Sequence, residues 1–305
     1  MKVSIVGHGI AGLMLGEELL SHGRQVVIYG KGCSQAPPQV IVHLHAGRSF
    51  RRSDLERLAF KKAVSYWRQS PFATEVKVKR DTNPRLEKSF TLTENDEWDS
   101  PLFDSKSYTY GPAFIVMADK LRQHLLGLLD FREFAVPTPL SVEEETLFED
   151  SDQVVFAQGF KSRLSYCSLN KGVSIFKEKR KSSANENRIR IGKGIHYATT
   201  AEGCSLGGAF LNSDNPRERL FEKTQHLIEA QEWENFKKEE MFSGQKLVSQ
   251  DRLPVVGFDS ANTFYFTAFG ARAFFWLPFS TQLAHKLLTK PTTQNAFSPL
   301  RFRSN

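Results

Sequence analysis

A glycine-rich turn over residues 7–12, reading Gly-His-Gly-Ile-Ala-Gly, has the residue types and spacing best suited to chemistry in this sequence. A short β-branched run over 2–6 predicts a buried strand before the turn, residues 13–20 have helical spacing, and 25–29 predict a second, apolar strand. Strand, glycine turn, helix and strand make the βαβ unit that places a pyrophosphate on a helix N-terminus. The pattern therefore predicts a dinucleotide site, and the alternative is a glycine-rich turn in an ordinary βαβ unit.

Each glycine of the turn has its own role in such a site. Gly7 permits the tight turn, Gly9 lets the backbone approach the phosphates, and Gly12 lets the helix pack closely on the strand.

The end of the second strand departs from the dinucleotide pattern. The pattern expects Asp or Glu there, to accept hydrogen bonds from the adenosine ribose, whereas this chain has Gly30 between Tyr29 and Lys31. One interpretation is that the lysine binds a 2′-phosphate, which would favour NADP. The alternatives are that the backbone makes the ribose contact or that this contact is lost.

The composition is that of an ordinary soluble protein, with 305 residues, 40% of them hydrophobic and 25% charged. No apolar run approaches the roughly 18 residues that span a membrane, and the N-terminus leads straight into a strand, so we expect neither a membrane span nor a signal peptide. Three cysteines without metal-binding spacing favour a reducing cytoplasm and no metal site. A net charge of +7 permits a nucleic-acid partner, and a solvated basic surface would give the same charge.

Further motifs follow in order along the chain. Residues 153–159 predict a buried strand ending in glycine, and 251–257 read Asp-Arg-Leu-Pro-Val-Val-Gly. A second glycine turn, Phe-Gly-Ala-Arg-Ala over 269–273, precedes a helix predicted for 277–289. A segment dense in lysine and arginine over 177–193 predicts either a solvated edge hairpin or a phosphate-contacting hairpin.

This order of motifs resembles the D-amino acid oxidase superfamily of FAD-dependent oxidoreductases, the group that contains glycine oxidase and sarcosine oxidase. The resemblance covers nearly the whole chain, and the turns at 7–12 and 269–273 are its most specific parts. Within the group, residues 194–197, 204–210, 250–257 and 270–273, with Pro278 after them, are similar to the oxidase module that acts in making 5-methylaminomethyl-2-thiouridine in tRNA. The resemblance implies FAD as cofactor and hydride transfer from a carbon–nitrogen bond of a secondary amine or amino acid.

The substrate implied by the closer resemblance is the carboxymethylaminomethyl group of a tRNA wobble uridine, with tRNA bound through a basic surface. Two alternatives stay open. One is an oxidase of a small free amino acid such as glycine or sarcosine. The other is a degenerate flavin-fold protein that binds a ligand or partner without turnover.

The fold class implied is α/β, α+β overall, with a Rossmann-like FAD-binding domain and an interleaved antiparallel-sheet substrate domain. The expected segments of the FAD-binding domain are 1–70, 108–165 and 245–290, and those of the substrate domain are 71–107 and 166–244. Residues 291–305 are expected to form a loosely held tail.

The residues implied to bind FAD lie in the two glycine turns, at the end of the second strand and on nearby segments. They are Gly7, Gly9, Ile10, Ala11, Gly12, Tyr29, Gly30, Lys31, His43, Ala157, Gly159, Gly270, Ala271, Arg272, Ala273 and Phe274.

Three side chains are implied to act on the substrate: Arg272, Lys246 and His45. A carboxylate is best bound by an arginine with two parallel donors, and Arg272 follows the second glycine turn. Arg272 could instead pair with a local carboxylate or a helix end. Lys246 offers a point charge rather than a fork, or is a surface lysine. His43 and His45 contact flavin or substrate, or are structural residues of a strand.

Overall fold

The computed structural model describes most of the 305-residue chain. The described residues are 1–31, 37–45, 53–81, 102–104, 107–133, 148, 150–162, 164–179, 187–192, 195–208, 236–259, 263–292 and 295–302. The centre of the basic segment, residues 180–186, lies outside them. The strands on either side, β9 (Cys167–Lys179) and β10 (Arg188–Gly192), are separated in their sheet by β12 and β11, so the predicted hairpin is wrong.

The chain forms two compact units, each made of segments that are separated in the sequence. The first unit consists of Met1–Gln35, Lys120–Asn170 and Gln245–Asn305, and the second unit of Ala36–Asp119 and Lys171–Gly244.

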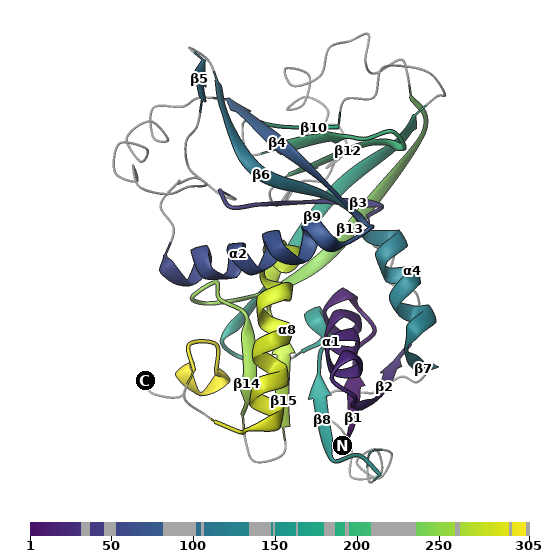
Figure 1. Ribbon diagram of the computed structural model, residues 1–305, viewed down its shortest axis with the longest axis vertical. Helices are drawn as coiled ribbons and strands as arrows, with labels where there is room; N and C mark the ends of the chain where they lie inside the picture. Colours follow the sequence, from purple (N-terminus) through teal and green to yellow (C-terminus); the bar gives the residue numbers. More distant parts are fainter. Residues whose placement is uncertain are drawn as a thin grey trace. The chain divides into compact units, whose positions relative to one another are not determined.

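The first unit has a sheet of the Rossmann type, with six strands in the order β14-β15-β8-β1-β2-β7 (Figure 1). The strands are β1 Lys2–Val6, β2 Gln25–Gly30, β7 Asp130–Glu133, β8 Gln153–Phe156, β14 Val255–Phe258 and β15 Thr263–Thr267. Neighbouring strands are parallel except for β14 and β15. β1 is buried over residues 3–6, with Val3 and Ile5 fully buried, because a central parallel strand is covered on both faces.

Two helices, α1 (Ile10–Ser21) and α8 (Ala273–Thr289), lie side by side in the first unit (Figure 1). Leu13, Leu15 and Leu19 of α1 are fully buried, and each contributes about 1.5–3 kcal/mol of hydrophobic stabilisation. A third helix, α4 (Ala118–Leu128), precedes β7. Short 3-10 turns are η2 Gly159–Lys161, η3 Gly270–Arg272 and η4 Pro299–Phe302.

The second unit has a nine-stranded sheet in which β13-β9-β12-β11-β10-β4-β6-β3 are neighbours in that order and β5 pairs with β6. The strands are β3 Gln39–His43, β4 Ala73–Asp81, β5 Leu102–Asp104, β6 Ser107–Met117, β9 Cys167–Lys179, β10 Arg188–Gly192, β11 Ile195–Thr199, β12 Gly203–Gly208 and β13 Phe236–Ser249. Pairing is antiparallel along most of the sheet, while β4 and β10 are parallel.

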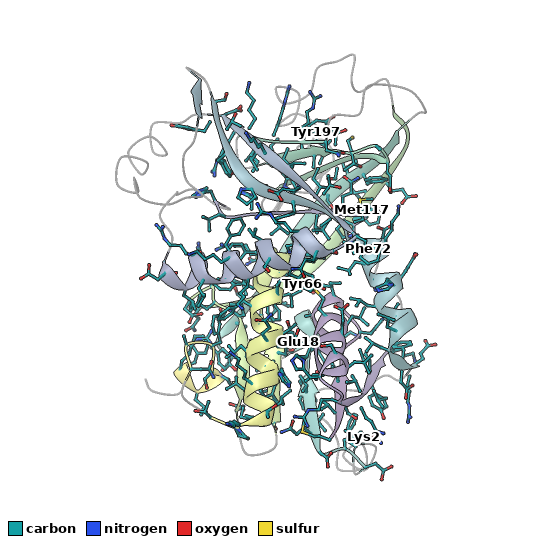
Figure 2. All side chains as sticks on the ribbon, viewed as in Figure 1. Lys2, Glu18, Tyr66, Phe72, Met117 and Tyr197 are labelled. Carbon is teal, nitrogen blue, oxygen red and sulfur yellow. The ribbon has the colours of Figure 1, made fainter. Side chains whose placement is uncertain are left out.

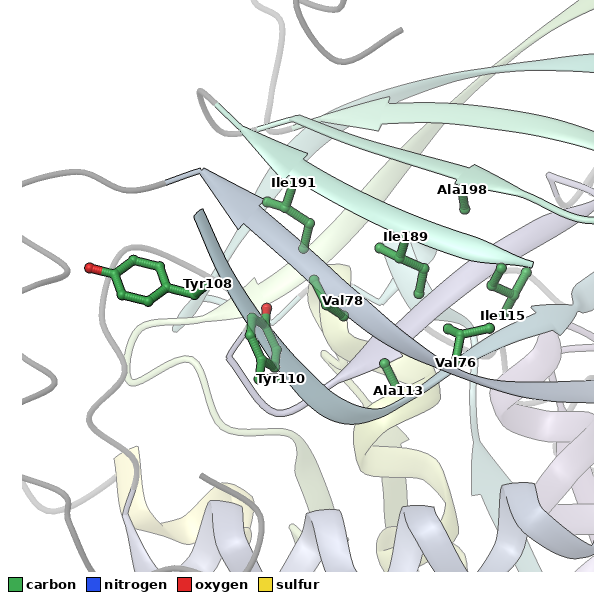
Figure 3. Close-up of a cluster of buried hydrophobic side chains, with 9 residues drawn as sticks. All are labelled: Val76, Val78, Tyr108, Tyr110, Ala113, Ile115, Ile189, Ile191 and Ala198. Atoms are coloured by element: carbon green, nitrogen blue, oxygen red, sulfur yellow. The ribbon is translucent and has the colours of Figure 1, made fainter. Parts of the chain in front are cut away.

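Alternation along β4 builds the core of the second unit. Val76 and Val78 turn to one face, where they join buried side chains of β6, β10 and β11 such as Ile115 and Ile189 (Figure 3). Helix α2 (Asp54–Gln69) begins at a capping box, in which the Ser53 hydroxyl accepts from the backbone N–H of Glu56 at 3.2 Å and the Glu56 carboxylate accepts from the Ser53 N–H at 3.1 Å.

The predicted fold class is confirmed, since a mainly parallel sheet with helices and a mainly antiparallel sheet are interleaved along the chain. The boundaries between the compact units differ from the predicted domain boundaries. Residues 36–70 and 108–119 belong to the second unit, because β3 pairs with the end of β6 and α2 packs on β4 and β6. Which unit binds a cofactor stays a prediction.

The C-terminal segment is packed rather than loosely held over residues 295–302. Phe297 is 2% exposed, and its carbonyl accepts a hydrogen bond from the Val256 N–H at 2.9 Å. The Arg301 guanidinium donates to both carboxylate oxygens of Asp251, at 2.7 and 3.1 Å, and to the carbonyls of Leu253 and Pro254. This fork joins residues that are 50 apart in the sequence, and no local sequence pattern predicts such a contact.

Replacing Arg301 by alanine is expected to destabilise the protein by about 2–3 kcal/mol, because the partly buried Asp251 carboxylate loses two charge-assisted hydrogen bonds. Burial tends to raise the pKa of Asp251, but hydrogen bonds from Arg301, from Leu253 N–H and from Ser249 lower it overall. The stabilisation is therefore present at neutral pH and lost as the pH falls through the lowered pKa. Urea unfolding at neutral and acidic pH measures both effects.

A matched control for this prediction lies on the surface. Arg68 makes an equally short fork to Glu75, at 2.8 and 2.9 Å, with both side chains more than 40% exposed. Arg68→Ala should cost no more than about 1 kcal/mol. If the two variants lose the same free energy of unfolding, the contacts of Arg301 do not specifically stabilise the C-terminal segment.

Candidate functional site

The first glycine turn is closed at Gly7. Its φ of 125° lies in the region that favours glycine, and its N–H donates to the Tyr29 carbonyl at 2.8 Å. A Cβ atom at this position would lie 2.6 Å from the carbonyl carbon of Ala157 and closer still to its oxygen. The turn thus passes directly over the end of β8, so the predicted residues Gly7 and Ala157 lie together.

The turn has no room for a side chain at Gly12, but it has room for one at Gly9. A Cβ atom at Gly12 would overlap the carbonyl oxygen of Gly7, whereas one at Gly9 meets no atom within 4 Å. Gly9 is the N-cap of α1, in an extended conformation, and no acidic side chain occupies the first turn of the helix. The N–H groups of Ile10 and Ala11 belong to the first turn, which lacks intrahelical acceptors. Open space beside such N–H groups fits an anionic pyrophosphate.

The side chain of His8, which the sequence analysis did not single out, lies against the end of β2. A Cβ atom at Gly30 would lie 2.7 Å from Cγ of the His8 ring and closer still to Nδ1, so the imidazole lies against Gly30. The ring also packs on Phe131 of β7, with centroids 5.3 Å apart. Lys31 follows as an exposed residue. The position of His8 between two glycines of the motif was the available signal.

The second glycine turn lies beside the end of β13. Gly270 has a φ of 59°, and Val248 pairs with Phe269 in an isolated bridge just before it. Lys246 lies two residues before Val248, and burial lowers the pKa of its ammonium group. The structure therefore brings the predicted residues Gly270 and Lys246 into neighbouring segments.

Arg272 stacks on aromatic rings of its own helix. Its guanidinium carbon lies 4.0 Å from the centroid of the Phe275 ring and 5.6 Å from that of Trp276. Cation–π contact holds the planar group in place. Ala271 and Ala273 flank it, and Phe274 is half-buried.

His43 and His45 belong to the second unit and sit round one tyrosine. Tyr110 Oη and His43 Nδ1 are 3.1 Å apart, and the His45 ring meets the Tyr110 ring edge-on at 5.1 Å. His45 is 1% exposed, and its carbonyl accepts from the Arg80 guanidinium at 2.8 Å. These contacts are those of a packed structural cluster, and a role in binding flavin or substrate stays a prediction.

A separate group of titratable side chains joins α1 and α8. Donor atoms of Glu18, His22 and His285 lie within 4.8 Å of one another, and the two imidazole rings stack at 3.9 Å; Figure 2 shows Glu18 on α1. The His22 ring Nδ1 lies 2.8 Å from the Glu18 carbonyl. Among the described residues this is the group best placed to hold a metal ion, and the expected absence of a metal stays a prediction.

Acidification is expected to weaken the contact between α1 and α8. Burial foremost, then the charges of His22, Arg24 and Lys286, lower the pKa of His285 below 6.5. Because the unfolded chain binds this proton more readily, stability present above the unfolded pKa is lost as the pH falls through the folded pKa. Thermal unfolding between about pH 7.5 and pH 5 measures it. The wild type should lose more stability than His285→Gln, and equal losses would contradict the prediction.

No protein-family model and no curated protein matches the sequence. Solved structures match the fold. Iminodiacetate oxidase from Chelativorans sp. BNC1 superposes with a TM-score of 0.75 at 14% identity, covering 97% of this chain and 98% of that chain. Glycine oxidase from Geobacillus kaustophilus gives 0.70 at 17% identity, covering 98% and 97%. A fructosyl peptide oxidase gives 0.74 at 11% identity, covering 96% and 91%.

The chain therefore has the fold of these amine and amino-acid oxidases along nearly its whole length, as the resemblance to the D-amino acid oxidase superfamily predicts. At these identities the likeness shows the fold alone. Within the part of the chain that the structure describes, no helix combines the length and apolarity needed to cross a membrane.

Proposed function

We propose that this chain is an FAD-dependent oxidoreductase that oxidises a carbon–nitrogen bond of a secondary amine or amino acid. One observation carries the proposal: the turn at residues 7–12 is sterically closed at Gly7 and Gly12 and open at Gly9, beside the N-terminus of α1. This is the arrangement that a dinucleotide pyrophosphate requires. The fold shared with amine and amino-acid oxidases supports flavin over nicotinamide.

FAD, when bound, accepts a hydride from the substrate carbon, and the protein supplies binding and orientation. Backbone N–H groups of Ile10 and Ala11 would hold the pyrophosphate. The turn at Gly270 and the N-terminal end of α8 carry positive backbone dipoles and would hold the other end of the cofactor. Lys246 and Arg272 supply positive charge for a substrate carboxylate.

The substrate class that we propose is an N-carboxymethyl amine. The carboxymethylaminomethyl group of a tRNA wobble uridine contains this unit, and the sequence resemblance and the net charge of +7 support it as the finer assignment. The fold neighbours support the alternative of a small free substrate, because iminodiacetate and glycine carry the same unit. Oxidation of the carbon beside nitrogen gives an imine, and its hydrolysis releases glyoxylate and the amine. A reducing cytoplasm is the compartment that we propose.

The visible spectrum of the purified protein, as isolated and after incubation with FAD, tests the proposal. We expect bound flavin absorbance, which anaerobic addition of glycine, sarcosine, iminodiacetate or modified tRNA should bleach whatever the natural electron acceptor is. A colourless protein that does not take up added FAD would sink the enzyme assignment. Bound flavin that none of the amines bleaches would favour the non-catalytic alternative.

The same assay separates the two substrate assignments. Steep salt dependence of tRNA binding, with each neutralised phosphate adding about one unit to the slope, would favour the wobble uridine. Bleaching by the free amino acids together with no tRNA binding would favour the small substrate.

Replacing Arg272 by methionine is expected to weaken substrate binding by about 10–100-fold, because a carboxylate loses two charge-assisted donors. Arg272→Lys should recover only part of the affinity, because the fork becomes a point charge. Perturbation of the flavin spectrum gives the substrate Kd. Lys290→Ala, an exposed cation at the far end of α8, is the control. If Arg272→Met lowers the Tm and leaves the substrate Kd unchanged, Arg272 stabilises the fold through its stacking contacts and does not bind the substrate.

A further inference from the structure

We infer that the carboxylate missing from the end of β2 is supplied one strand away, by Glu133 at the end of β7, and that His8 fixes this arrangement. The inference rests on the proposed binding of FAD and names the contact for its adenosine ribose. It concerns residues that neither the sequence pattern nor the fold likeness singles out.

The sheet register places Glu133 beside the vacant position. β2 and β7 are parallel, and Gly30 and Glu133 are register partners, so they stand about 4.8 Å apart across the sheet. Both residues end their strands, and ligands of open parallel sheets bind beyond the carboxyl ends of the strands. Glu133 is exposed, and its carboxylate can therefore reach a ligand at this edge.

The His8 ring shows which face of β7 is involved. It packs on Phe131, and Glu133 follows Phe131 by two residues, so both side chains leave the strand on the face where His8 lies. A side chain at position 30 would run into the same ring, because a Cβ atom there would lie 2.7 Å from His8 Cγ. An acid at position 30 and a histidine at position 8 exclude each other in this geometry. His8 therefore fills the space above Gly30, and Glu133 is the acid that stands in register with Gly30 on that face.

The other charged residues of β7 lie on the opposite face. Arg132 alternates with Phe131 and Glu133, and its guanidinium lies 6.0 Å from the ring centroid of Tyr29 and 3.3 Å from the Asp130 carboxylate. Asp130 thus pairs with a cation on the far face. Asp130→Asn makes the same charge change on the same strand as Glu133→Gln, which provides a matched control.

A carboxylate suits the adenosine ribose because its oxygens accept hydrogen bonds from the hydroxyl groups. Isothermal titration of the apoprotein with FAD, ADP and 2′-deoxy-ADP tests this contact without relying on turnover. The wild type should bind ADP about 10-fold more tightly than 2′-deoxy-ADP, and Glu133→Gln should lose this preference and bind FAD about 10-fold more weakly. Asp130→Asn should bind all three ligands as the wild type does.

Relocating the acid tests the role of His8. Gly30→Glu alone should fail to bind FAD or should destabilise the protein, because the new side chain meets the His8 ring. The triple variant His8→Ala, Gly30→Glu, Glu133→Gln should recover FAD affinity to within about 3-fold of the wild type, because the acid returns to the usual strand.

The remaining outcomes distinguish failure of this inference from failure of the proposed function. Equal FAD affinities for Glu133→Gln and Asp130→Asn would overturn the inference and leave the proposed function intact. Tighter binding of 2′-phospho-ADP than of ADP by the wild type would replace it with a 2′-phosphate site at Lys31. A wild type that binds neither FAD nor ADP would overturn the proposed function as well.

Discussion

Replacing Gly9 by valine is expected to leave the first unit folded and to weaken FAD binding by about 100-fold or more, the cost of about two charge-assisted hydrogen bonds. A Cβ atom at this position meets no protein atom within 4 Å, and the backbone there, with φ of −69° and ψ of 168°, suits a β-branched residue. The added methyl groups would instead fill the space that the pyrophosphate needs. The substitution therefore separates cofactor binding from folding.

Quenching of flavin fluorescence during titration of the apoprotein gives the affinity, and thermal unfolding gives the stability. Gly127→Val is the matched control, because a Cβ atom at Gly127 in α4 also meets nothing within 4 Å. The control should bind FAD as the wild type does. If the Gly9→Val protein binds FAD as tightly as the wild type does, the pyrophosphate does not bind at this turn. The proposed function would then lose its main support.

The parts of the fold that depend on neighbours in sequence could be predicted. The βαβ unit is contiguous, so the apolar runs and the three glycines suffice to place β1, α1 and β2. The contact of Arg272 with Phe275 and Trp276 was also within reach, because residues three and four apart meet on a helix.

The parts that depend on distant pairings could not be predicted. β3 follows β2 directly in sequence, yet it belongs to the second unit because its register partners are residues 113–117 of β6. The ordered C-terminal segment depends in the same way on Asp251. Neither partner carries a local pattern that identifies the other.

Gly30 shows how a departure from a motif acquires meaning from its surroundings. In the sequence, it leaves three readings of the ribose contact open. In the structure, the His8 ring occupies the space of its missing side chain, and Glu133 stands in register with it. Position 30 is therefore kept as glycine by its packing against the His8 ring.

Replacing Gly12 by alanine is expected to have the opposite effect to the change at Gly9: it should damage the fold itself. The new Cβ atom would overlap the carbonyl oxygen of Gly7, a backbone atom whose position is fixed by the hydrogen bond from Gly7 N–H to Tyr29. Helix α1 would have to move away from β1, at a cost of about 3 kcal/mol or more.

Urea unfolding of the apoprotein measures this cost in the absence of any cofactor. Gly127→Ala is the control, since alanine replaces glycine in a helix with open space and should stabilise by about 0.5–1 kcal/mol. Gly12→Ala should be strongly destabilised or insoluble, and FAD should not restore it, because the strain lies between α1 and the turn rather than in the ligand space. If the Gly12→Ala protein is as stable as the wild type, helix α1 can move away from β1 at little cost in free energy. The close packing of α1 on the turn at residues 7–12 would then be wrong.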